Sequence, residues 1–157
     1  MQASKLMAIL AILAPGGASA QTVPNLSGTW VLQVDKSNYG GLQGPQSRTD
    51  VIEHREPKLT IRRTTVAGGQ ENQATLVYEI DGKPYKNMVG PTEITSTLRW
   101  EGNVLVSVTL APGPQGEVTI TDRYELSADG QTLTQLRTLS VQGQELMQTM
   151  VLARQQP

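Results

Sequence analysis

The sequence predicts an all-β protein, an antiparallel up-and-down meander of about ten strands closed into a barrel. Apolar and polar residues alternate with a period of two along almost every segment, and Thr and Val are abundant, as in half-buried strands. The connections are too short for the crossovers that parallel strands require. The expected strands are 28–34, 48–55, 58–65, 74–80, 85–89, 93–100, 104–110, 117–126, 132–141 and 145–153.

Turn residues separate these segments. Glu56-Pro57 joins the second expected strand to the third, since proline is favoured in turns. Asp81-Gly82-Lys83 and the segment 127–131 have the composition of hairpin turns. An even number of strands places the first and the last antiparallel. We therefore expect these two strands to pair and to close the edge of the sheet.

The first twenty residues have the pattern of a secretory signal peptide. Lys5 precedes the apolar run 6–14, and Ala18-Ser19-Ala20 is a small-residue cleavage site. The apolar run is too short to span a bilayer. We therefore expect a signal peptide over 1–20 and one barrel domain over 21–157, exported to the periplasm or the extracellular space, with no membrane span.

Composition argues against several classes of function. With 13 basic and 14 acidic residues in 157, the chain has no general attraction for nucleic acid or anionic membranes. One His and no Cys leave few groups for nucleophilic catalysis or for zinc. We therefore expect no enzyme activity, no metal and no cofactor. His54 as an axial haem ligand and a catalytic pair of carboxylates are the alternatives that stay open.

The expected connections differ in length between the two ends of the barrel. The segments 35–47, 66–73 and 111–116 are longer than the others and rich in Gly or Pro. Alternate connections of an up-and-down barrel lie at opposite ends, so these three segments share one end. Loops of this kind commonly frame binding sites. We therefore expect an interior cavity that opens toward them.

Strand parity places a small polar set inside the barrel. Asp122 lies in the apolar stripe of Ile120 and Tyr124, where a carboxylate is costly unless it is paired. Counting back from the turn near 129–130 places Asp122 opposite a residue near Arg137, and we expect Arg137 to be the cation that it meets. A mostly apolar pocket with a few polar anchors is typical of small-molecule sites. The expected ligand-binding residues are His54, Arg63, Tyr78, Trp100, Asp122, Tyr124 and Arg137. The alternative is that Asp122 and Arg137 only pair with each other and fill a narrow barrel.

Gly28-Thr29-Trp30 stands at the start of the first expected strand, before a Gly-rich segment. A Gly-x-Trp in this place, followed by a meander, resembles the calycin superfamily of lipocalins and fatty-acid-binding proteins, and especially small secreted bacterial lipocalin-like proteins of unknown role. The resemblance implies that Arg154, after the last strand, packs across the Trp30 indole. The alternative is that Trp30 is only a core residue and that Arg154 belongs to a frayed C-terminal tail. The chain departs from fatty-acid-binding proteins because it lacks their C-terminal Arg-x-Tyr and because 35–47 is too rich in Gly and Pro for their two helices.

These observations predict a secreted or periplasmic lipocalin-like barrel whose partner is a small apolar or amphipathic molecule. The alternative is a protein-interaction module, such as an inhibitor or envelope partner, that acts through its long loops without a small ligand. Gly28, Trp30 and Arg154 are expected to close the barrel, since glycine permits close approach and a guanidinium over an indole is favourable. The sequence predicts no particular oligomeric state.

Overall fold

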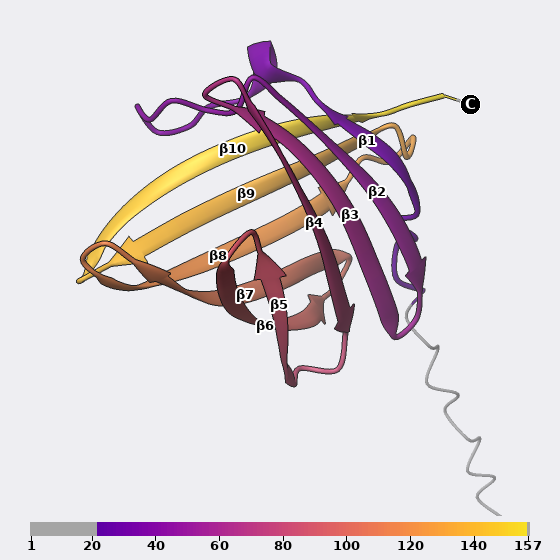
Figure 1. Cartoon of the computed structure of the whole chain (residues 1–157). Helices are drawn as coiled ribbons and strands as arrows, with labels where there is room; N and C mark the ends of the chain where they lie inside the picture. Colours follow the sequence, from indigo (N-terminus) through magenta and orange to yellow (C-terminus); the bar gives the residue numbers. More distant parts are fainter. Residues whose placement is uncertain (1–21, 157) are drawn as a thin grey trace, which may run out of the picture.

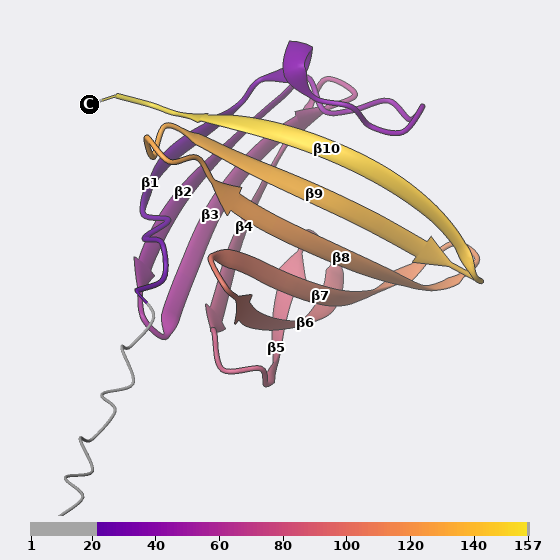
Figure 2. The same cartoon turned by 180° about the vertical axis from the view of Figure 1, so that it is seen from behind.

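The computed structural model describes residues 22–156 and shows ten antiparallel strands wrapped into a nearly closed barrel (Figures 1 and 2). The predicted all-β meander is therefore confirmed. A short 3-10 helix, Val34–Lys36, follows the first strand. The predicted signal peptide lies outside the described residues. The strands are β1 (Gly28–Leu32), β2 (Ser47–Arg55), β3 (Lys58–Ala67), β4 (Gln70–Glu79), β5 (Pro84–Val89), β6 (Thr92–Glu101), β7 (Val104–Gly113), β8 (Gly116–Leu126), β9 (Thr132–Val141) and β10 (Gln144–Arg154).

The first and last strands pair, as predicted. Strand order in the sheet is β4-β3-β2-β1-β10-β9-β8-β7-β6-β5, and Trp30 lies opposite Arg154 where β1 meets β10. The edges of this sheet are therefore β4 and β5. Both are fully described and adjacent, yet no backbone ladder joins them. We call this junction the β4–β5 seam.

Two of the three predicted long connections are strands joined by tight turns. Residues 66–67 and 70–73 belong to β3 and β4, and only Gly68-Gly69, both with positive φ, form the turn. Most of 111–116 likewise belongs to β7 and β8. Pro112 is tolerated because the ladder of β7 with β6 has already ended at Leu110, which leaves an edge position there. Between described strands, the long connection is 33–46.

One end of the barrel is sealed, and we call it the closed end. The fully buried Trp30 fills it, and the indole Nε1 donates to the Leu26 carbonyl at 2.9 Å. The Arg154 guanidinium lies 4.3 Å from the centroid of the Trp30 ring. Gly28 has a φ of 143°, and a Cβ there would collide with Arg154 Nη1. The structure thus brings the three predicted closure residues together.

Among residues 22–156, no helix has the length and apolar character needed to cross a membrane.

Candidate ligand-binding cavity

A cavity of about 340 Å³ lies inside the barrel. Its deep part is lined by buried leucines of the closed end, including Leu59 and Leu105. Its other end is lined by Val89, Thr92 and Ala111, of which Val89 is 43% exposed. The cavity therefore runs from the closed end to a mouth beside the turn between β5 and β6. Of the three segments predicted to frame the mouth, only 111–116 contributes to the lining, through Ala111.

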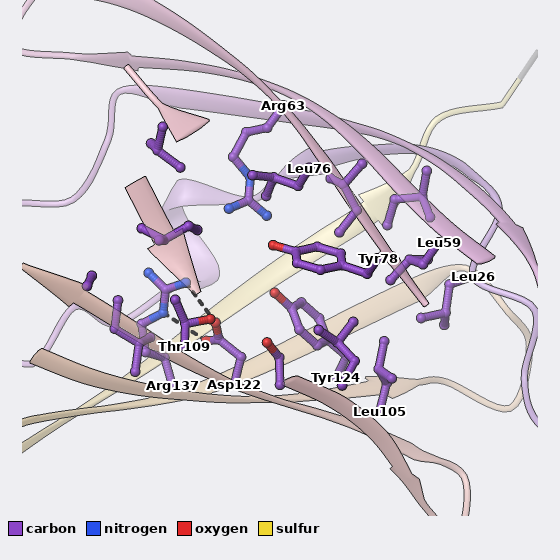
Figure 3. A pocket seen from close by; sticks show the side chains of 18 of the residues that line it. Leu26, Leu59, Arg63, Leu76, Tyr78, Leu105, Thr109, Asp122, Tyr124 and Arg137 are labelled. Atoms are coloured by element: carbon purple, nitrogen blue, oxygen red, sulfur yellow. Dashed lines mark hydrogen bonds and ion pairs between the residues drawn. The ribbon is translucent and has the colours of Figure 1, made fainter. Parts of the chain in front are cut away.

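The structure brings five of the seven predicted ligand-binding residues together. They come from β3, β4, β8 and β9, and their side chains point into the same space (Figure 3). The period of two places them there, since each occupies an inward position of its own strand. These residues are Arg63, Tyr78, Asp122, Tyr124 and Arg137.

His54 and Trp100 are not among the lining residues, contrary to prediction. His54 Nδ1 accepts a hydrogen bond from the Leu26 backbone N–H at 3.2 Å, and His54 Nε2 lies 2.7 Å from Glu56 Oε1. Trp100 Nε1 donates to the same Glu56 oxygen at 2.8 Å, and the two rings are 5.9 Å apart. Because Glu56 and Leu26 hold these rings, they help to plug the closed end.

Asp122 and Arg137 form a two-pronged ion pair on the cavity wall. Arg137 Nε and Nη2 lie 2.8 and 2.9 Å from the two carboxylate oxygens of Asp122. The strands β8 and β9 place these residues directly opposite each other, in the register that the turn predicts. Gln135 Nε2 also donates to Asp122 Oδ1 at 2.8 Å. The two residues both pair with each other and line the cavity, so the two expectations were not exclusive.

A second ion pair faces the first. Arg63 Nε and Nη2 lie 2.8 and 2.9 Å from the carboxylate oxygens of Asp50. Arg48 also donates to this carboxylate. Arg48 Nη1 then donates to Gln135 Oε1 at 2.8 Å, which links the two pairs. We call this set the Arg–Asp network; its members are Arg48, Asp50, Arg63, Asp122, Gln135 and Arg137.

Sequence reasoning missed three members of this network: Arg48, Asp50 and Gln135. A signal for them was present. Arg48 and Asp50 share the parity of the apolar Ile52, and Gln135 shares that of Leu133, so all three occupy inward positions. Parity alone would therefore have placed two more charges inside the barrel.

The charges of the network support one another. Burial alone would raise the pKa of Asp50, but the Arg63 and Arg48 guanidiniums hold that pKa well below its usual range. Burial works against the charge of Arg63, yet the Asp50 carboxylate outweighs it and keeps the pKa of Arg63 raised. Burial, and then Asp122, raise the pKa of Tyr124 to about 12. At neutral pH, Asp50 and Arg63 are therefore charged, and Tyr124 is a neutral hydrogen-bond donor.

These groups are suited to binding a molecule. Leucines and isoleucines supply apolar walls, while the arginines and tyrosines supply donors that strands and ion pairs hold in place. Among the described residues, no three His, Cys, Asp or Glu side chains come close enough to hold a metal ion.

Comparisons with known proteins identify the fold. No family model and no curated protein sequence matches the chain. A secretory abundant heat soluble (SAHS) protein from Ramazzottius varieornatus is similar in structure, with a TM-score of 0.64 and 14% identity over 86% of this chain and 98% of that one. Zebrafish ileal bile acid-binding protein complexed with cholic acid has a TM-score of 0.58 and 14% identity over 83% and 98%.

The fatty-acid-binding protein from Manduca sexta has a TM-score of 0.54 and 17% identity over 82% of this chain and 99% of that one. At such low identity these likenesses concern the fold and not the ligand. The chain has a calycin-like β-barrel fold.

Proposed function

We propose that this barrel binds a small, mainly apolar molecule in its interior. The observation that carries the proposal is the cavity itself. Its volume of about 340 Å³ falls within the range of about 300–1,000 Å³ of ligand pockets. Its walls combine many apolar side chains with a few polar groups held in place, and that combination is typical of small-molecule sites.

The comparisons support the same proposal. Two barrels of similar fold are a bile acid-binding protein, complexed with cholic acid, and a fatty-acid-binding protein. The alternative function, a protein-interaction module that acts through its long loops, has lost most of its structural support. Two of the three segments behind it, 66–73 and 111–116, are largely strand.

We further propose that the barrel acts after export. The support is the leader-like pattern of Lys5, the apolar run 6–14 and Ala18-Ser19-Ala20. Expression of the full chain in a bacterial host, followed by N-terminal sequencing of the mature protein, tests this. We expect the mature protein to begin at Gln21 in the exported fraction. A protein that keeps Met1 and stays inside the cell would contradict export.

Binding in the cavity can be tested with N-phenylnaphthylamine, a neutral apolar dye that fluoresces in dry sites. The Ala111→Trp variant places an indole at the mouth, and we expect it to weaken dye binding about tenfold or more. Leu110→Trp is the matched control, because Leu110 neighbours Ala111 on β7 but is not a lining residue. Equal binding by both variants would show that the dye binds elsewhere. Native mass spectrometry of protein purified from its source would then identify a retained ligand by mass.

A further inference from the structure

The Arg–Asp network carries an unbalanced charge. It contains three arginines but only two aspartates, so one net positive charge lies inside the barrel. Among the described residues that line the cavity, Asp122 is the only acid, and it already serves Arg137. A charge held away from water is unfavourable without a counter-charge. The network therefore favours the entry of one negative charge.

Donors are available to receive that charge. Arg63 and Arg137 each use Nε and Nη2 on their aspartates, and no described residue accepts from the Nη1 of either. The Tyr124 hydroxyl likewise has no protein partner among these residues. Tyr39 Oη is the one described side-chain polar atom that is both fully buried and without a partner, so the unpaired groups of Arg63, Arg137 and Tyr124 are not fully buried. The free donors of Arg63, Arg137 and Tyr124 are therefore open to the cavity. Figure 3 shows the two guanidiniums on facing walls, with the Tyr78 and Tyr124 hydroxyls directed toward the space between them.

The network also divides the cavity along its length. On β3, Leu59 and Ile61 lie between the closed end and Arg63, and on β8 the Tyr124 position lies between the closed end and Asp122. We call the part of the cavity between the network and the closed end the deep chamber. Among the described residues, four buried leucines line it: Leu26, Leu59, Leu98 and Leu105. An apolar group is thus best placed toward the closed end, and a charged group at the network, on the side of the mouth.

We propose that the cavity takes an amphipathic monoanion, bound tail first. Its carboxylate or sulfonate lies between Arg63 and Arg137 and accepts a hydrogen bond from Tyr124. Its apolar body fills the deep chamber toward Leu26. This inference rests on the proposed function, since it names the class of molecule and its orientation in the same cavity.

Two dyes that differ in one group test the charge. Anilinonaphthalene sulfonate (ANS) is N-phenylnaphthylamine with an added sulfonate, so the pair isolates the anion. Arg63→Gln makes the network neutral while Asp50 keeps Arg48 as a partner. We expect this variant to bind ANS about ten- to a hundredfold more weakly, with a much smaller loss for the neutral dye.

Two further variants complete the test. Arg62→Gln removes the same charge from the exposed neighbour of Arg63, which pairs with Glu53 outside the barrel, and ANS affinity is expected to stay within about twofold. Asp122→Asn adds one net positive charge and is expected to strengthen ANS binding by about tenfold. Circular dichroism shows whether Arg63→Gln folds. If it does not, Asp122→Asn still tests the preference for an anion.

Orientation is tested by displacement of ANS. Undecanoate is expected to compete well, whereas undecanoate that carries a dansyl group on its terminal carbon is expected to compete about tenfold less well, because the deep chamber is closed. Equal competition would overturn the tail-first orientation. If both dyes respond alike to every variant, the anion preference is wrong and the proposed function stands. If neither dye binds in the cavity, the proposed function itself fails.

Discussion

The barrel is joined by backbone at one junction and by side chains at another. β1 and β10, from opposite ends of the described chain, share a ladder, and Arg154 then covers Trp30 beside it. β4 and β5 follow each other in sequence, through residues 80–83, yet share no ladder across their described length. Closeness in sequence therefore did not decide which strands pair.

A few side chains hold the β4–β5 seam. The Asn87 amide accepts from the Val77 N–H at 2.8 Å and donates to the Val77 carbonyl at 3.1 Å, as an opposing strand would. Tyr85 Oη also donates to Asp81 at 2.9 Å. β5 begins at Pro84, which has no N–H to offer, and the exposed residues 70–73 of β4 lie beyond its reach. The seam should therefore be the weaker junction.

The largest effect is expected at the closed end. Trp30→Ala empties a fully buried site, and we expect the free energy of unfolding to fall by about 3–5 kcal/mol. Urea unfolding followed by circular dichroism measures the loss. Trp100→Ala is the control, since Trp100 also lies at the closed end but is only partly buried. An equal loss in both variants would remove the special role of Trp30.

The next largest effect is expected at Arg154. Its guanidinium covers Trp30 and donates to the Ser27 carbonyl at 2.6 Å and the Gly130 carbonyl at 2.8 Å. We expect Arg154→Ala to lower the free energy of unfolding by about 1.5–3 kcal/mol. Arg154→Lys keeps the charge without the planar fork and should fall in between. If Arg154→Ala is as stable as the parent, the guanidinium does not stabilise the protein, and Trp30 contributes through its own packing alone.

Acid should weaken the same side of the barrel. Asp50 lies opposite Trp30 where β1 pairs with β2, and its pKa is depressed in the folded state by Arg63 and Arg48, against the effect of burial. The stability that it contributes is fully present above the unfolded pKa of about 3.9 and is lost as the pH falls toward the folded pKa. The slope for this one proton approaches about 1.4 kcal/mol per pH unit.

Asp50→Asn should remove that slope, because the amide does not titrate. Urea unfolding of both proteins from pH 6 down to pH 2 measures the difference. If the two curves stay parallel below pH 4, Asp50 does not account for the acid sensitivity.

The smallest global effect is expected at the seam. Asn87→Ala removes both hydrogen bonds to Val77, yet the site is exposed, and we expect a loss of about 1 kcal/mol or less. The local effect should be larger, because the Val77 amide loses its partner and should exchange faster with deuterium. Asn72→Ala, on the exposed part of β4, is the control. Unchanged protection of Val77 would show that the seam does not depend on Asn87.

Much of the fold followed from local patterns. Period-two alternation placed the strands within a few residues of their bounds, and the turn at 127–131 placed Asp122 opposite a residue near Arg137, which the structure shows to be Arg137 itself. The glycines and prolines of 66–73 and 111–116 led us to predict long loops there, and that prediction was wrong. Gly68-Gly69 needs only two residues for its turn, and Pro112 lies at an edge where its missing N–H costs little. Composition does not reveal where a neighbouring strand ends.

Alternation of successive side chains between the two faces of a sheet let the sequence by itself determine which side of most strands faces inward. It did not do so for β7, where the less apolar set lines the cavity: Leu105, Ser107, Thr109 and Ala111. That rule is local and needs no knowledge of neighbours. Only the tertiary structure decided what the inward residues meet. Arg48 of β2 reaches Gln135 of β9, and Glu56 draws His54 and Trp100 to the closed end. Such contacts depend on curvature and on strands distant in sequence, so alternation along one strand cannot specify them.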